Sequence, residues 1–349
     1  MSAIVNRPVR TDRTLKSMPH MRHRGLLALK CGLTIGILFY IITVIPGDQV
    51  IQFVNTARAW YVIMAFVIVV PAVYVSACRL KILTDTQGMS LSFSRIAQIN
   101  FITYFYGLLL PGYLPASAVR WYKFSQLDDK RVEAFAAIAF SRLHFMIFVV
   151  VLGIVFSMLD QSHAQQNVVT FSLLALLFCL CAMHFVGVNS RTLLLFDWMN
   201  QTRGTRVPGL FRRSIVNLLL ATGQYAGLSR RALSSVAGLS LLENLLSILS
   251  TYILACSLNI QITFVSIAWV RSVIQIVTLL PISVAGIGIR DGGLIVLLEP
   301  YGVPGPQAVA LSFLILARAL FLAAIGGAIE AKNLLSPFER RGTAQTVRK

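Results

Sequence analysis

The sequence predicts an all-α membrane protein, a polytopic helical bundle of about six transmembrane helices plus two re-entrant broken-helix hairpins that form an inverted repeat. Hydrophobic residues make up 56% of the 349-residue chain, charged residues make up 13%, and the mean hydropathy is +0.75. Soluble globular proteins carry roughly 25% charged residues. Apolar runs of about 20 residues recur, and this is the length at which a helix crosses the hydrocarbon core. Two further apolar segments are interrupted by proline and glycine.

The uninterrupted apolar runs are the predicted spans. They are residues 26–45, 60–78, 134–159, 168–188, 233–256 and 307–329. The interrupted segments are 96–119, which contains Pro111, Gly112 and Pro115, and 264–298, which contains Pro281, Gly286 and Gly288. We therefore expect a basic tail at 1–25, a single transmembrane domain at 26–330 and a second basic tail at 331–349. Within the domain, we expect a first repeat at about 26–188, a basic amphipathic connector at 189–231 and a second repeat at about 233–330.

The basic residues predict the orientation. Of the 31 lysines and arginines, 26 fall in residues 1–30, 79–95, 120–131, 189–231 and beyond 330, whereas the loops between these regions contain only Arg58. Because basic loops stay in the cytoplasm, both termini are predicted to be cytoplasmic. The net charge of +18 is spread between apolar runs and does not form one soluble face, so nucleic acid is not an expected partner.

The two interrupted segments resemble each other. Residues 109–120 read LLPGYLPASAVR and residues 279–290 read LLPISVAGIGIR, so the separation from Pro111 to Arg120 equals that from Pro281 to Arg290. In the predicted topology they enter from opposite faces. Inverted repeats of broken helices are a common transporter design with the binding site between them. Two unrelated kinked helices are the alternative.

Arginines within apolar stretches are candidates for function, because a buried cation is costly and the planar guanidinium suits phosphate. We expect them to bind an anionic lipid headgroup in a hydrated cavity, with half-helix N-termini offering further N–H groups. Structural ion pairs with Asp291, Glu299 or Glu243 are the alternative. Glu243 could instead relay a proton or bind a headgroup amine. The candidate site residues are Arg120, Arg142, Glu243, Pro281, Ser283, Gly286, Gly288, Arg290, Asp291 and Arg318.

Motifs of soluble enzymes are missing from the sequence. It contains no P-loop, HExxH or GxSxG pattern, and GIGIRDG does not have the dinucleotide-binding glycine spacing. The five cysteines lie in or beside apolar spans with no CxxC pair. We therefore expect no catalytic residue, no cofactor and no metal.

The stretch LLPISVAGIGIRDGGLIVLLEPYGV resembles the signature of the lysylphosphatidylglycerol synthase transmembrane-region family, also described as flippase-like. The matching positions are Pro281, Ser283, Gly286, Gly288, Arg290, Gly302 and Val303. Ala285 stands where the family usually has glycine, and Asp291 where it has glutamate. The earlier segment is similar to another family motif at Pro111 and Arg120, but it departs at Ala116, Ser117 and Ser141, where acidic residues are usual.

The resemblance implies a polytopic inner-membrane protein that handles a lipid. In the aminoacyl-lipid synthases of the family, a soluble C-terminal domain makes the lipid and the membrane part moves it. This chain ends about 19 residues after its last predicted span, so we expect no aminoacyl-transfer module. The expected function is translocation of a phospholipid or a polyprenyl-phosphate-linked lipid. The alternatives are a membrane-embedded lipid or polyprenyl-phosphate transferase and an accessory subunit of a neighbouring lipid-modifying enzyme, such as a glycosyltransferase.

Overall fold

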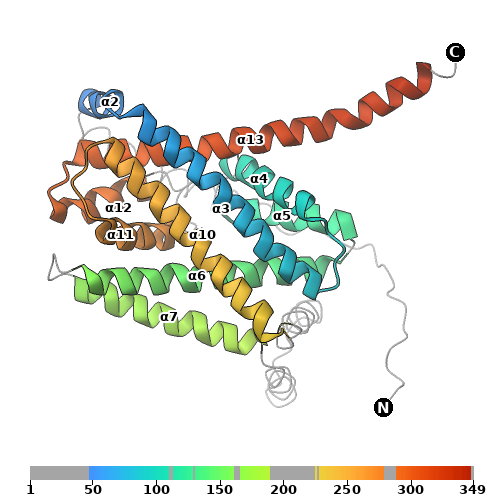
Figure 1. Cartoon of the computed structure of the whole chain (residues 1–349), viewed down its shortest axis with the longest axis horizontal. Coiled ribbons are helices and arrows are strands. Elements are labelled where there is room, and N and C mark those ends of the chain that lie inside the picture. The colour runs from blue at the N-terminus through green and yellow to red at the C-terminus, as the bar shows by residue number, and fades with distance from the viewer. Residues whose placement is uncertain are drawn as a thin grey trace, which may run out of the picture.

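The structure is a computed structural model that describes residues 47–109, 113–128, 130–160, 166–188, 225, 228–278 and 288–346. Within these ranges the chain is helical apart from turns and short connections, and contains no strand (Figure 1). The all-α prediction is therefore confirmed. The first predicted span, 26–45, and most of the predicted connector, 189–231, lie outside the described residues.

Apart from a short helix at Gly47–Asn55, where the sequence predicts a loop between spans, the helices follow the predicted order. They are α2 (Gly47–Asn55), α3 (Ala59–Thr86), α4 (Phe93–Leu109), α5 (Tyr113–Asp128), α6 (Arg131–Leu159), α7 (Gln166–Val188), α10 (Arg230–Ser257), α11 (Phe264–Val277), α12 (Ile289–Leu298), the short 3₁₀ helix η2 (Glu299–Tyr301) and α13 (Gly305–Thr346). Four of them, α3, α6, α10 and α13, are long and apolar enough to cross a membrane. The chain is thus a polytopic helical membrane protein.

The long helices extend past the predicted spans. The apolar run that predicted a span at 60–78 continues as α3 to Thr86, and this extension carries Arg79 into the protein interior. At 1.5 Å per residue, the 28 residues of α3 measure about 42 Å. Since the hydrocarbon core is about 30 Å thick, α3 is long enough to cross it at a tilt. Figure 1 shows α3 and α10 running obliquely to α6 and α7.

Both interrupted segments are pairs of helices. In the first, α4 ends at Leu109 and α5 begins at Tyr113; in the second, α11 ends at Val277 and α12 begins at Ile289. Pro111 and Pro281, which predicted the breaks, lie outside the described residues, as do Ser283 and Gly286. Gly288 caps α12 with a φ of +85°, a backbone conformation that glycine adopts without a Cβ clash.

Each helix that leads into a break packs on a long helix from the other half of the chain. Helix α4 packs along α13, α11 packs along α6, and α3 packs along α10 (Figure 1). The largest apolar core lies around α10, α11, α12 and α13 and includes Leu254, Ile267, Leu298 and Leu311, all fully or almost fully buried. The two halves are therefore interlocked.

The contact between α4 and α13 depends on Gly326. A Cβ atom at this position would lie 2.0 Å from the Phe101 carbonyl oxygen of α4, far inside van der Waals contact. Small residues permit such close backbone approach between membrane helices. Gly153 is a second position of close helix contact, between α6 and α11, since an added Cβ would lie 3.1 Å from the Ser272 Cβ.

A polar cluster joins the ends of α6, α11 and η2. Trp269 Nε1 donates to Asp160 Oδ2 at 2.9 Å and to the Tyr301 hydroxyl at 2.8 Å, and that hydroxyl donates to Asp160 Oδ2 at 2.5 Å. Burial, followed by the Asp160 carboxylate, raises the pKa of Tyr301 to about 12. Because the hydroxyl keeps its proton, it remains a donor to Asp160, and the cluster links α6, α11 and η2.

Candidate functional site

A cavity of about 310 Å³ lies inside the helical bundle. Among the described residues, six arginines from six helices line it, together with one glutamate from a seventh: Arg79 (α3), Arg120 (α5), Arg142 (α6), Arg271 (α11), Arg290 (α12), Arg318 (α13) and Glu243 (α10). We call it the arginine cavity. The four arginines proposed from sequence and Glu243 therefore line one cavity, although Arg120 and Arg318 are almost 200 positions apart in the sequence.

The arginine cavity lies deep within the long helices. At 1.5 Å per residue, Arg142 lies about 16 Å along α6 from its first residue, and Glu243 and Arg318 lie about 20 Å along α10 and α13. A helix that enters a hydrocarbon core about 30 Å thick at its first residue would carry these positions well away from either surface. Charged side chains at such depth face a bundle interior or a hydrated cavity and mark functional pathways.

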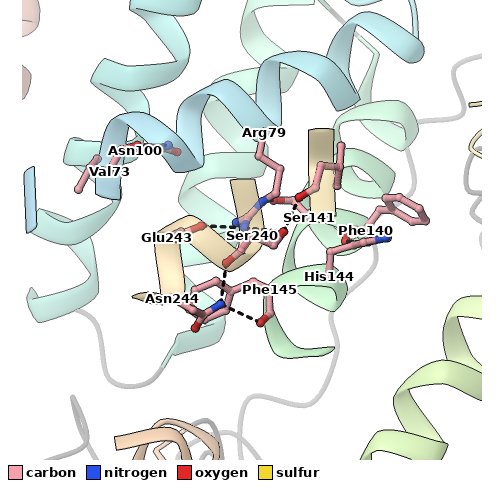
Figure 2. Close-up of polar contacts among 11 residues, drawn as sticks. Val73, Arg79, Asn100, Phe140, Ser141, His144, Phe145, Ser240, Glu243 and Asn244 are labelled. Atoms are coloured by element: carbon pink, nitrogen blue, oxygen red, sulfur yellow. Dashed lines mark hydrogen bonds and ion pairs between the residues drawn. The ribbon is translucent and has the colours of Figure 1, made fainter. Parts of the chain in front are cut away.

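Arg79 connects three helices at one edge of the cavity. Its Nη1 lies 2.7 Å from Glu243 Oε2 and donates to Ser240 Oγ at 3.1 Å, both on α10, while its Nε donates to Ser141 Oγ of α6 at 2.9 Å (Figure 2). Arg79 is only 3% exposed. The planar fork of arginine can serve all these partners at once.

Arg142 and Arg120 are the other two cavity arginines from the first half of the chain. The Arg142 guanidinium lies 5.5 Å from the centre of the Phe145 ring, which the Arg79 guanidinium also approaches, at 5.7 Å. Arg120 is held more loosely, since its Nε lies 3.5 Å from Thr103 Oγ1.

Hydroxyl groups hold the arginines of the second half. Arg271 Nη2 donates to Ser247 Oγ at 2.5 Å, and Arg318 Nη1 donates to Ser250 Oγ at 2.7 Å and to Thr251 Oγ1 at 3.3 Å. All three acceptors belong to α10. A hydroxyl acceptor orients a guanidinium and adds no negative charge of its own.

Asp291 lies next to Arg290 but is not among the residues that line the cavity. Its Oδ2 accepts from the Gly288 N–H at 2.7 Å, and its Oδ1 accepts from the Ser312 hydroxyl and lies 3.6 Å from Arg290 Nη2. Ser312 Oγ in turn accepts from Arg290 Nε at 2.6 Å. Asp291 therefore caps α12 and orients Arg290. It also takes one of the helix N-terminal amides that we expected an anionic ligand to use.

Uncharged polar side chains also face the cavity. They include Asn100, Thr103, Ser117, Gln275 and Thr278. Asn100 is 1% exposed, its Nδ2 donates to the Val73 carbonyl at 3.4 Å, and its Oδ1 accepts no hydrogen bond within the described part of the chain (Figure 2). The lining therefore offers uncharged hydrogen-bonding groups as well as arginines.

Two lining arginines, Arg79 and Arg271, were not among the candidates from sequence. From sequence, Arg79 belongs to a predicted cytoplasmic loop, because the apolar run ends at Cys78. Arg271 lies before the break in the second interrupted segment, not after it as Arg290 does. One signal could have identified Arg79: Val69, Ala72, Ser76 and Arg79 recur at helical spacing, and all four line the cavity. The salt bridge from Glu243 to Arg79 was likewise not considered from sequence.

The fold and the site define a class: a polytopic α-helical membrane protein with a strongly cationic cavity inside its bundle. Residues 27–327 match the family described as lysylphosphatidylglycerol synthase TM region, so the chain belongs to this family. The resemblance noted at 281–303 thus extends over most of the chain, and it places the protein among membrane proteins of lipid biosynthesis or handling. A search of curated proteins found no match.

Proposed function

We propose that this protein is a flippase-like lipid translocase of the inner membrane, which takes an anionic lipid headgroup into the arginine cavity while the lipid tails stay in the bilayer. The residues that line the cavity are the main support for this proposal. Among the described residues, an excess of arginine lines the cavity, six arginines against one glutamate. Such an excess is costly in a low-dielectric interior unless anions or water compensate it. A volume of about 310 Å³ is at the lower end for ligand pockets, roughly 300–1,000 Å³, and suits a headgroup.

The two halves form an inverted repeat of re-entrant hairpins in this proposal. In this repeat, α3, α4, α5 and α6 of the first half correspond to α10, α11, α12 and α13 of the second half. The contact between α4 and α13 then has an equivalent in the contact between α11 and α6. The contact between α3 and α10 is its own equivalent. Arg120 then corresponds to Arg290, and Arg142 to Arg318. This exchange supports a pseudo-twofold axis in the membrane plane, around which alternating access would occur.

Two acidic residues near the predicted cytoplasmic ends, Asp128 and Glu133, have local roles that do not favour a transferase. Asp128 Oδ2 accepts from the Ser90 N–H at 2.9 Å, and Glu133 lies in the first turn of α6, where a carboxylate stabilises a helix. A transferase would use carboxylates at one surface for its chemistry. The placement of these carboxylates therefore favours a translocase over a transferase.

Leaflet exchange by the purified protein tests the function. The protein would be reconstituted into liposomes with tail-labelled anionic phospholipids, and the outer-leaflet label would be quenched chemically. We expect exchange without a new product by mass spectrometry. Arg120→Gln and Arg290→Gln should each lower the rate at least tenfold, since each removes a cation from the cavity. Arg95→Gln, on an exposed position of α4, is the matched control.

Three results would overturn the proposal: no exchange of any lipid by the wild type, a new lipid product, or wild-type rates in both cavity variants. Arg120 is the more informative of the two, because its loose contact with Thr103 means that glutamine there should leave the fold intact. Unchanged thermal unfolding of Arg120→Gln would establish that the loss of exchange is not a folding defect.

A further inference from the structure

We infer that two polar clusters, one on each side of the arginine cavity, act as its gates, and that each gate closes the cavity toward one face of the membrane. The inference rests on the proposed function for the movement that the gates control, and it adds the residues that control it. The first gate consists of Tyr106, Lys123 and Glu330, and the second gate consists of Asp160, Trp269 and Tyr301.

The first gate joins the hairpin of α4 and α5 to α13. Lys123 Nζ donates to both carboxylate oxygens of Glu330, at 2.8 and 2.9 Å, and the Tyr106 hydroxyl donates to Glu330 Oε1 at 3.0 Å. Glu330 is 6% exposed. An unpaired charge is costly at such burial, so the carboxylate depends on these donors. The cluster therefore stabilises the hairpin in its position against α13.

The second gate joins the helices of the other hairpin to α6. Asp160, at the end of α6, accepts from Trp269 Nε1 of α11 at 2.9 Å and from the Tyr301 hydroxyl of η2 at 2.5 Å. Asp160 and Trp269 are both buried. These two donors are uncharged, whereas the first gate includes a lysine. Each gate is thus built on one buried carboxylate that holds donors from two helical elements.

The arginine cavity lies between the two gates. Tyr301 lies just before α13, whereas Arg318 and Glu330 lie about 20 Å and about 37 Å along this helix from its first residue. Figure 1 shows α11 and α12 beside the first part of α13, and α4 and α5 further along it. The gate residues are not among the described residues that line the cavity. Since α13 leads into the predicted cytoplasmic tail, the first gate lies toward the cytoplasm.

Both gates cross the boundary between the two halves of the chain. In the first gate, α4 and α5 of the first half contact α13 of the second half; in the second gate, α11 and η2 of the second half contact α6 of the first half. Rotation of one half against the other repacks the polar contacts between them. Opening of one gate while the other stays closed would expose the cavity to one face only, as alternating access requires.

Thiol labelling of the cavity tests the first gate. Ser117→Cys, in a background with the native cysteines replaced by serine, places one thiol in the lining. Glu330→Gln should raise the rate at which an impermeant reagent labels this thiol at least fivefold in inside-out membrane vesicles, because glutamine forms no ion pair with Lys123. The rate in right-side-out vesicles should not rise. Asp85→Asn, which breaks the exposed Lys81–Asp85 pair within α3, is the matched control.

The second gate should give the opposite result. Tyr301→Phe removes the hydroxyl that donates to Asp160, so it should raise labelling at least fivefold in right-side-out vesicles and not in inside-out vesicles. Tyr106→Phe, which removes one hydrogen bond from Glu330, is the milder variant of the first gate and should act in the same direction as Glu330→Gln. An equal rise from both faces in each variant, or no rise in any of them, would overturn the inference.

Cross-linking tests whether the first gate has to open during transport. In the same background, Lys123→Cys/Glu330→Cys would be reconstituted into liposomes and joined by a bifunctional methanethiosulfonate. We expect lipid exchange to slow at least tenfold and to recover after reduction, because the link holds the hairpin against α13. Lys81→Cys/Asp85→Cys is the control pair, since both residues belong to α3 and their link should not change exchange. Unchanged exchange with the first gate linked would contradict the inference.

The combined outcomes distinguish the gates from the translocase function. If the gate variants open opposite faces and the wild type exchanges no lipid, the translocase function fails and the gates stand. If lipid is exchanged but neither labelling nor cross-linking responds at the gates, the gates fail and the translocase function stands.

Discussion

Arg79 joins three helices through one guanidinium group. Its salt bridge to Glu243 and its hydrogen bonds to Ser141 and Ser240 are buried between α3, α6 and α10. A buried ion pair of this kind often contributes little net stability compared with apolar groups of the same size, but loss of one partner strands the other charge. The pair therefore makes the arrangement of the three helices sensitive to either residue.

Arg79→Met should lower the free energy of unfolding by roughly 3 kcal/mol, because it strands the Glu243 carboxylate in the interior. The double variant Arg79→Met/Glu243→Met should regain most of that loss, since the stranded charge is gone. Thermal unfolding in detergent, analysed as a double-mutant cycle, measures both effects. A double variant no more stable than Arg79→Met would show that the salt bridge is not what couples these residues.

Helices α4 and α13 illustrate how the elements are positioned. Each break ends an incoming helix, α4 or α11, and that helix is held against a long helix of the other half, α13 or α6. Lipid tails are as apolar as leucine, so close van der Waals packing at small residues drives such contacts more than burial from water does. Gly326 is the position at which backbone meets backbone.

Gly326→Ala should destabilise the protein by about 1–3 kcal/mol and slow lipid exchange, because the added Cβ would lie 2.0 Å from the Phe101 carbonyl oxygen and only a backbone shift can relieve the clash. Thermal unfolding and the liposome assay check this. Gly238→Ala on α10 is the matched control, since a Cβ there meets nothing within 4 Å and alanine favours the helix. Equal stability of the two variants would contradict the close-packing account.

At the scale of the whole molecule, the arginine cavity lies between the two halves, and each half supplies three of its six arginines: Arg79, Arg120 and Arg142 from the first, Arg271, Arg290 and Arg318 from the second. Rocking of one half against the other would change the access to these charges from one face to the opposite one. The proposed orientation, with both termini in the cytoplasm, decides which end of each helix faces which compartment.

Labelling of single cysteines in intact cells tests that orientation. In a background with the native cysteines replaced by serine, Gln261→Cys should react with a membrane-impermeant thiol reagent, whereas Arg95→Cys should react only after the cells are permeabilised. Both positions are exposed and lie at opposite ends of the predicted topology. The reverse pattern would invert the protein in the membrane and would contradict the rule that basic loops stay in the cytoplasm.

What the sequence by itself determined is local along the chain. Hydropathy and helix-breaking residues correctly predicted the all-α membrane class, four long helices and the two breaks, because the length of an apolar run and the presence of proline or glycine depend on neighbouring residues only. The spacing from Pro111 to Arg120 and from Pro281 to Arg290 identified two of the cavity arginines before their contacts were known.

Tertiary structure decided which charges meet. Hydropathy indicates how deep a residue lies, but the neighbours and rotation of its helix decide what its side chain contacts. The packing of α3 along α10 brings Arg79 to Glu243, and the packing of α11 along α6 brings Arg271 into a cavity that also contains Arg142. Cross-helix contacts of this kind join residues more than 100 positions apart, and no local pattern specifies them.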